Sequence, residues 1–396
     1  MWYPLNEKTY KRVNGIPTLD DSDNEKLAIN NSNLSSFLQR SLQLPSLALF
    51  AGSGTSLGEP MGPSMHDLWV KCMLKNSEFD ETKDYSSQMT DVAIKICNTV
   101  HYNELSNPNI EHFLSFCDAY LMVNDSEEEV SAFVRGVKEN VLSLCSGFLL
   151  NPACDLSAYK DLLFRLAKRR VRDPRLKVFT TNYDMCFETA SSDLGMMVVD
   201  GFSYTRRRRF DGQYFNYDVV RRDNESHAYI QGVIQLYKLH GSVSWERSDG
   251  GVYESQNVDP DKACLIYPAK GKYQQAFIQP YLELLSRFLE HLRQPNNCLV
   301  MSGFGFNDDH LSEPIFSAIK SNPSFKLIVS DFSACMNIYK NNKYWRLLSD
   351  AALNGADITF INSSFKNLSL LIPNLTALTP AEQLAHSLKA VTREAF

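Results

Sequence analysis

The stretch LALFAGSGT, residues 47–55, joins an apolar run to a tip of glycines and hydroxyls. Three later stretches repeat this plan with other polar tips: KVFTTNYD at 177–184, LYKLHGS at 236–242 and LVMSGFG at 299–305. Each apolar run has the length and composition of a buried strand. In an open parallel α/β sheet, ligands bind outside the carboxyl ends of the strands. We therefore expect the four polar tips to meet at one crevice and to form a nucleotide-processing site.

The rest of the chain alternates strand-like and helical patterns in a way that fits such a sheet. Further strand-like segments lie near 197, 264, 327 and 358, and helical stretches at 277–292 and 309–319 separate several of them. Strand, helix and strand in alternation predict an α/β fold with a doubly wound, mostly parallel, Rossmann-like sheet.

Changes in the spacing of apolar residues along the chain indicate further subdivisions. Between 64 and 170 the apolar period becomes helical, which indicates a helical insertion after the first strand. Residues 203–232 interrupt the alternation and fit a loop or a β-ribbon. The expected division is an N-terminal arm (1–44) with a short helix near 34–42, a sheet domain (45–63 and 171–370), the helical insertion (64–170) and a C-terminal helix (371–396) that is a candidate assembly element.

Bulk properties narrow the classes of function. A net charge of -6 over 396 residues gives no electrostatic reason to expect direct nucleic-acid binding. No segment approaches the ~18 apolar residues of a membrane span, and the first residues lack a secretory signal, so we expect a cytoplasmic protein with no membrane partner. The nine cysteines are scattered, which favours buried free thiols and offers no paired ligands for a structural zinc.

The first tip has the composition of a phosphate-binding loop. Gly52 and Gly54 allow backbone N–H groups to approach a pyrophosphate, and Ser53 and Thr55 add hydroxyl donors. A tight connection from strand to helix would explain the same glycines without any ligand.

The second and third tips carry acid–base candidates. Asn182 would orient a ribose hydroxyl or a water molecule, and Asp184 would accept a hydrogen bond from a ligand amide, although an Asx-turn or a helix N-cap explains both equally. His240, followed by Gly241, is the histidine best placed to act as a general base near neutral pH. A structural histidine at a strand end is the alternative.

The last tip and its neighbours supply further candidates. Ser302 and Gly303 permit another close backbone approach, and Phe304 could stack on a base, although a turn with core phenylalanines would look the same. Asp331 ends a strand where an acidic side chain often meets a ribose. The arginines 206–209 fit a phosphate, an acidic partner or a solvated charge run.

Taken in order, these motifs resemble the sirtuin, or Sir2-like, catalytic domain. The family's Gly-Ala-Gly-x-Ser loop is similar to residues 51–56, its Thr-Gln-Asn-x-Asp motif to 180–184 and its catalytic His-Gly to 240–241, while its Gly-x-Ser loop corresponds loosely to 303–305. The resemblance covers about 45–365. Thr181 replaces the family's Gln, and the four-cysteine zinc module of the protein deacetylases is missing.

Residues 242–245 and 265–270 look like the Sir2-like proteins of bacterial anti-phage defence, a branch that consumes NAD⁺. The resemblance implies an NAD⁺ glycohydrolase that needs no metal. NAD⁺ would be its substrate, with the pyrophosphate against Gly52–Thr55 and the adenosine end toward Gly303–Phe306. Thr181, Ser302 and Asp331 are further expected NAD⁺-binding residues. Asp184 would hold the nicotinamide carboxamide, Asn182 the ribose and the attacking water, and His240 would remove a proton.

The same resemblance implies regulation by assembly. A homo-oligomer and a HerA-like hexameric ATPase partner are expected, because an unrestrained NAD⁺ hydrolase would be toxic. Two other functions remain open from the sequence: an NAD-dependent protein deacylase, and a non-catalytic sensor of NAD or ADP-ribose that scaffolds an assembly.

Overall fold

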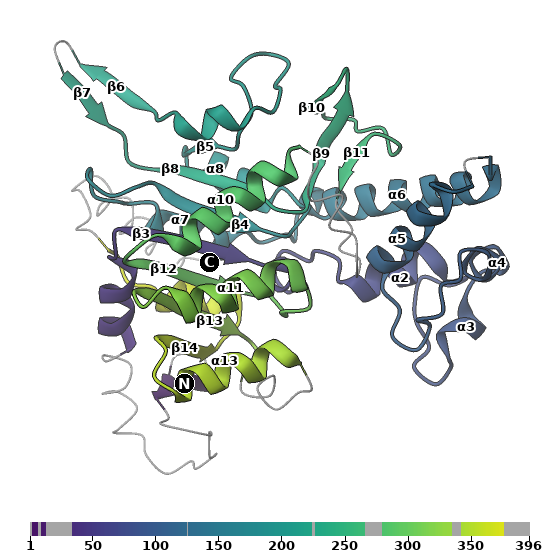
Figure 1. The fold of residues 1–396 in the computed structure, drawn as a ribbon, viewed down its shortest axis with the longest axis horizontal. Helices are drawn as coiled ribbons and strands as arrows, with labels where there is room; N and C mark the ends of the chain where they lie inside the picture. The colour runs from purple at the N-terminus through teal and green to yellow at the C-terminus, as the bar shows by residue number, and fades with distance from the viewer. Residues whose placement is uncertain are drawn as a thin grey trace.

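A computed structural model of the chain describes residues 2–6, 9–12, 34–124, 126–223, 226–265, 279–334 and 342–375. Its central feature is a nine-stranded sheet with the strand order β2-β1-β14-β13-β12-β3-β4-β8-β5 (Figure 1). The strands of this sheet are β1 (Trp2–Asn6), β2 (Thr9–Arg12), β3 (Ser46–Ala51), β4 (Leu176–Thr180), β5 (Met197–Val199), β8 (Val233–Lys238), β12 (Asn297–Ser302), β13 (Phe325–Asp331) and β14 (Ile358–Asn362).

Neighbouring strands pair in parallel from β14 to β5, and β1 adds to β14 in the same direction. Among the described strands of this sheet, only β2 runs antiparallel to its neighbour. This pattern confirms the predicted α/β fold with a doubly wound, mostly parallel sheet.

Helices cover both faces of the sheet, which explains why its strands have continuous apolar sequences. Alternate residues of one strand enter two different cores: Phe50 of β3 packs in one and Leu49 in the other. The first core also contains helices α10 (Tyr281–Arg293), α11 (Asp309–Ser321) and α13 (Lys343–Leu353), which lie over the sheet in Figure 1. The second contains a helix over 34–42, α7 (Ser157–Leu166), α8 (Cys186–Asp193) and α14 (Phe365–Leu371).

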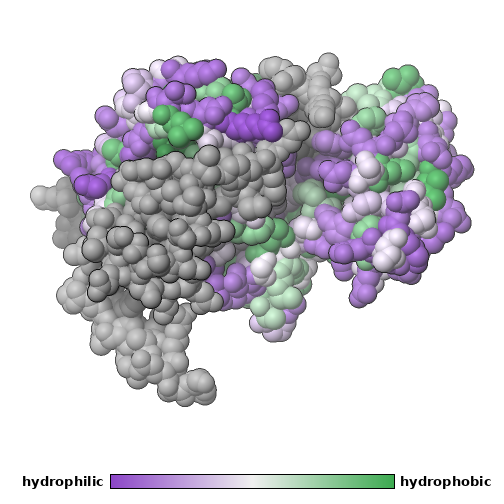
Figure 2. Space-filling model, turned by 90° about the horizontal axis from the view of Figure 1, so that it is seen from below, coloured by the Kyte–Doolittle hydropathy of each residue, from purple (hydrophilic) through white to green (hydrophobic). Residues whose placement is uncertain are grey.

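The helical insertion forms a third core beside the carboxyl edge of the sheet. Its helices are α2 (Met65–Met73), α3 (Tyr85–Gln88), α4 (Asp91–Thr99), α5 (Ile110–Leu121) and α6 (Glu128–Gly147). Trp69, Tyr102 and Phe113 are almost fully buried among them. In Figure 2 the insertion is the right-hand lobe, and its surface is mainly hydrophilic. Helix α7, which precedes the expected boundary at 170, packs against α8 and α14. The boundary itself stays a prediction.

Two smaller sheets complete the described chain. Residues 203–232, expected as a loop or β-ribbon, contain the 3₁₀ helix η3 (Gly212–Asn216) and the hairpin of β6 (Val220–Asp223) and β7 (Ser226–Tyr229). Directly after β8, the strand β9 (Gly241–Ser248) pairs with β10 (Gly251–Glu254) and β11 (Ala263–Leu265). Short 3₁₀ turns occur at η1 (Ser53–Thr55) and η2 (Phe148–Leu150).

The N-terminal arm contains two strands that the sequence did not predict. The helix over 34–42 is present, but β1 and β2 extend the main sheet, with Trp2 opposite Ile361 of β14. The edge of β14 has unpaired backbone groups to which another strand can add. The local sequence of the arm does not indicate this pairing. The predicted helix after residue 375 and the segment 266–270 lie outside the described residues. Among the helices that are described, none has the length and apolar character of a membrane span.

Candidate active site

The order of the strands reverses at β3. This strand pairs with β4 on one side and with β12 on the other, so the connections leave in opposite directions. The loops after β3 and β12 consequently face each other at the carboxyl edge, which is where ligands bind in doubly wound sheets. The backbone N–H of Gly52 donates to Ser302 O at 2.9 Å, and that of Gly54 donates to Gly303 O at 3.0 Å.

The glycines of these loops are needed for close packing of backbone on backbone. A Cβ on Gly52 would lie 2.4 Å from Gly303 O, and Gly303 has a φ of +65° with the backbone N of Thr55 only 2.6 Å from its ideal Cβ. The sequence predicts that the Gly52 and Gly54 N–H groups approach a phosphate. In the structure the Gly52 N–H already donates to the last residue of β12, and the Gly54 N–H donates to the first residue of the loop that follows.

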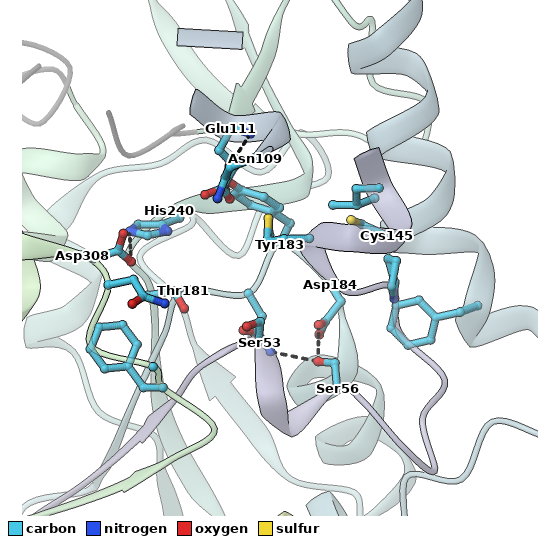
Figure 3. A pocket seen from close by; sticks show the side chains of 18 residues that line it. Ser53, Ser56, Asn109, Glu111, Cys145, Thr181, Tyr183, Asp184, His240 and Asp308 are labelled. Carbon is cyan, nitrogen blue, oxygen red and sulfur yellow. Dashed lines mark hydrogen bonds and ion pairs between the residues drawn. The ribbon is translucent and has the colours of Figure 1, made fainter. Parts of the chain in front are cut away.

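A cavity of about 140 Å³ lies beside these loops, between the sheet domain and the helical insertion (Figure 3). Four strand-end loops and the insertion share its wall. The lining residues are Ser53, Ser56, Thr181, Asn182, Tyr183, Asp184, His240, Phe304, Gly305, Asn307 and Asp308 from the loops, and Pro63, Met65, Leu68, Asn109, Glu111, Cys145 and Phe148 from the insertion and its ends.

The loop after β4 places Asn182 and Asp184 in this wall. The Ser56 hydroxyl donates to Asp184 Oδ2 at 2.5 Å, and the Cys186 N–H donates to Asp184 Oδ1 at 3.0 Å, an Asx-turn that starts α8. The Asn182 amide donates to Ser56 Oγ at 2.8 Å, as well as to Thr55 Oγ1 at 3.2 Å. Among the described residues, no partner reaches the buried Asn182 Oδ1. Asn182 therefore keeps one acceptor for a ligand.

A buried lysine holds this loop from behind. Lys238, only 2% exposed, donates to the backbone oxygens of Tyr183 and Asp184 and to Glu188 Oε1 at 3.0 Å. Sequence reasoning treated it as one residue of a strand. A lysine inside an apolar run is nevertheless a signal, because such a charge is buried only when it is paired.

His240 stands at the end of β8 and is 2% exposed. Its Nε2 lies 3.3 Å from His310 Nε2 and 3.9 Å from Asp308 Oδ2. Burial, together with the neighbouring His310, holds the pKa of His240 well below its usual range, so the imidazole is neutral at pH 7. Gly241 is required after it, since φ is +91° and a Cβ would lie 2.0 Å from Cys264 O.

The wall also contains two carboxyl groups that the sequence did not predict. Glu111, near the start of α5, accepts a hydrogen bond from the Tyr183 hydroxyl at 2.7 Å (Figure 3). Burial and the charge of Asp308 raise the pKa of Glu111 to about 8, and burial raises the pKa of Asp308 to about 6. His310 is a further residue near the cavity that the sequence did not predict. One feature of the sequence could have indicated this residue: it follows the glycine-rich tip closely and is near Asp308 in the chain.

The other predicted site residues divide into two groups. Ser53, Thr181 and Phe304 line the cavity, whereas Gly52, Gly54, Thr55, Ser302 and Gly303 form the packed loops behind it. Asp331 ends β13 and is not among the lining residues; its Oδ1 accepts the Ser333 N–H at 2.8 Å. The contact of Asp331 with a ribose stays a prediction. Among the described side chains, no group of three or more potential metal ligands occurs.

Part of this chain matches a known protein family. Residues 176–346 match the family model of the SIR2-like domain. The SIR2-like segment begins at β4 and ends within α13, so it contains Asn182, Asp184, His240 and the loop after β12. Among curated proteins, none matches this chain.

Solved structures with a similar arrangement include several Sir2 homologues. One is a complex of a Sir2 homologue with NAD, at 12% identity and a TM-score of 0.42, covering 84% of this chain and 90% of that one. Another is a Sir2 homologue mutant with ADP-ribose, at 12% identity and a TM-score of 0.41, covering 86% and 95%. A third, with 2′-O-acetyl ADP-ribose, has the same identity, TM-score and coverages.

Proposed function

We propose that this chain is an NAD⁺ glycohydrolase that cleaves NAD⁺ into nicotinamide and ADP-ribose. One observation carries the proposal: Asn182, Asp184 and a neutral, buried His240 line a single cavity at the strand-order reversal, inside the SIR2-like segment. The Asn182 Oδ1 without a protein partner suits a ribose hydroxyl or a water molecule.

The proposed reaction is the hydrolysis of an N-glycosidic bond. The bond between ribose C1′ and the pyridinium nitrogen breaks, and its electron pair neutralises the ring, which leaves as nicotinamide. Water adds to C1′, and His240 accepts the proton that this water loses. The leaving group is already activated by its charge, so the protein mainly supplies orientation, a base and shelter from bulk solvent.

The other residues of the site have supporting roles in this proposal. Asn182 would position the ribose and the water. Asp184 would hold the nicotinamide carboxamide through Oδ2, the oxygen that accepts the Ser56 hydroxyl in this structure. The pyrophosphate would lie along Ser53 and Thr181, which line the cavity, since the Gly52 and Gly54 N–H groups are already bonded.

We further propose that the enzyme works in the cytoplasm as an NAD-depleting effector of anti-phage defence. Its activity would be restrained by self-assembly or by a HerA-like ATPase partner. This part of the proposal is supported by the sequence resemblance described above.

The test is product analysis of NAD⁺ incubated with the purified protein. We expect nicotinamide and ADP-ribose from the wild type, and a rate at least about 100-fold lower in Asn182→Ala and in His240→Ala. Asn98→Ala, an exposed substitution on α4 outside the cavity, is the matched control and should retain the wild-type rate.

Other outcomes identify the rival functions. Nicotinamide release that requires an acyl-lysine peptide would assign a deacylase instead. NAD⁺ binding without turnover, persisting when a HerA-like ATPase is added, would assign a sensor.

A further inference from the structure

The charged groups of the cavity wall are nearly all acidic. Glu111, Asp184 and Asp308 contribute three carboxyl groups, and the described lining contains no lysine or arginine. The proposed substrate carries charges of both signs: its pyrophosphate is anionic, and its nicotinamide ring is cationic. An acidic wall favours the cationic part.

Two of these carboxyl groups lack a protein counter-ion. Asp184 is hydrogen-bonded through both oxygens, as described above. Within the described chain, no lysine or arginine forms an ion pair with Glu111 or Asp308; Glu111 receives the Tyr183 hydroxyl, and Asp308 faces the neutral His240 at 3.9 Å. Because a buried carboxylate is stable only when it is compensated, this wall is suited to a cation supplied by a ligand.

Other titratable groups around this pair do not supply that cation. His112 of α5 lies near Asp308, but its Nδ1 is 3.0 Å from Glu104 Oε2. Burial lowers the pKa of His310 to about 4, so this ring is neutral. Asp309 adds a further negative charge beside Asp308. With pKa values raised to about 8 and 6, Glu111 and Asp308 together hold roughly one proton at pH 7.

The cavity is large enough to enclose one ring of a dinucleotide. A cavity of about 150 Å³ is known to bind benzene. The 140 Å³ of this cavity therefore suits a single six-membered ring, while the rest of the ligand extends outward.

We propose that Glu111 and Asp308 select the positively charged pyridinium ring of an oxidised dinucleotide over the neutral dihydropyridine ring of the reduced form. The inference rests on the proposed use of NAD⁺ and assigns its specificity to two residues, one of them from the helical insertion. When the cation enters, it replaces the proton that the two carboxyl groups hold, so binding releases a proton near pH 7.

The test compares two probes by titration calorimetry at pH 7: carbocyclic NAD⁺, which keeps the pyridinium charge but resists cleavage, and NADH. Each titration is performed in phosphate and in Tris, whose different ionisation enthalpies report the protons released. We expect the wild type to bind carbocyclic NAD⁺ at least about tenfold more tightly than NADH and to release a proton only with the former.

Glu111→Gln and Asp308→Asn should each reduce this preference about tenfold and lower the proton release, with NADH affinity unchanged. Glu139→Gln, an exposed substitution on α6, is the matched control. Unfolding curves of each variant establish that it is folded. A preference that survives in both folded variants, or equal binding of the two probes by the wild type, would overturn the inference.

The outcome is separable from that of the proposed function. Charge selectivity that depends on Glu111 and Asp308, in a protein that does not cleave NAD⁺, would support the inference and contradict the hydrolase. Cleavage of NAD⁺ by the wild type, with charge selectivity unaltered in both variants, would support the hydrolase and contradict the inference.

Discussion

A single buried lysine fixes the shape of the loop that carries Asn182 and Asp184. Isolated in the interior, the Lys238 ammonium would be costly to bury, yet it is satisfied by two backbone oxygens and by Glu188. The two oxygens belong to Tyr183 and Asp184, so the position of the ammonium determines the path of the loop. We regard Lys238 as a positioning residue, since it is not among the residues that line the cavity.

Replacing this lysine should separate stability from activity. Lys238→Met leaves Glu188 without its counter-ion, and we expect a loss of unfolding free energy on the order of 3 kcal/mol. The double variant Lys238→Met/Glu188→Gln should recover most of that loss, because no charge remains unpaired. Its NAD⁺ cleavage rate should stay low, because the loop is no longer held. Denaturant unfolding measures the stability, and nicotinamide release measures the cleavage rate. A double variant that recovers both its stability and its cleavage rate would contradict a positioning role.

At the scale of elements, the start of α5 illustrates which of two electrostatic effects dominates. Asn109 caps this helix by accepting the N–H groups of Glu111 and His112. The helix dipole favours a charged Glu111 by about 0.3–1 kcal/mol. Burial and the charge of Asp308 act in the opposite direction and prevail, since they raise the pKa of Glu111 from 4.5 to about 8.

This raised pKa predicts how stability depends on pH. Between about pH 4.5 and 8 the folded chain keeps a proton on Glu111 that the unfolded chain has released, so stability falls as pH rises through this window, by up to about 1.4 kcal/mol per unit. Glu111→Gln removes that dependence. We expect the variant to match the wild type at pH 5 and to exceed it by roughly 2–4 kcal/mol at pH 8. Urea unfolding at both pH values measures this; a variant less stable than wild type at pH 8 would refute it.

For the whole molecule, the cavity is the place where separate cores meet. The insertion has its own apolar core, but Tyr183 of the sheet domain and Val243 of β9 are part of it. The hydrogen bond from Tyr183 to Glu111 crosses the same boundary. A ligand in the cavity would therefore contact elements of both the insertion and the sheet domain.

Amide hydrogen exchange should reveal this coupling. We expect saturating carbocyclic NAD⁺ to slow exchange at 181–184, 302–308 and 109–112 together, because a ligand that binds only the folded cavity opposes local opening of its whole wall. The strand β6 (Val220–Asp223), which does not line the cavity, is the internal control. Protection confined to the loops of the sheet domain would show that the insertion takes no part in binding.

The sequence by itself determined the sheet and the polar tips of its central strands. Buried parallel strands have continuous apolar runs, and the four tips occupy the carboxyl edge as predicted. These patterns are local, so they can be read without knowledge of distant contacts. The helical period of the insertion is local in the same sense.

Only the tertiary structure decided which side chains complete the site. Glu111 and Asp308 are distant in the chain and share a wall because α5 packs against the loops of the sheet. Likewise, Gly52 and Gly303 meet through the pairing of β3 with β12, which places their backbones too close for any side chain. Contacts between distant segments depend on packing, and a pattern of neighbouring residues does not encode them. The periodicity of the apolar residues thus determined the sheet and its helices, whereas tertiary packing determined which charged side chains line the cavity.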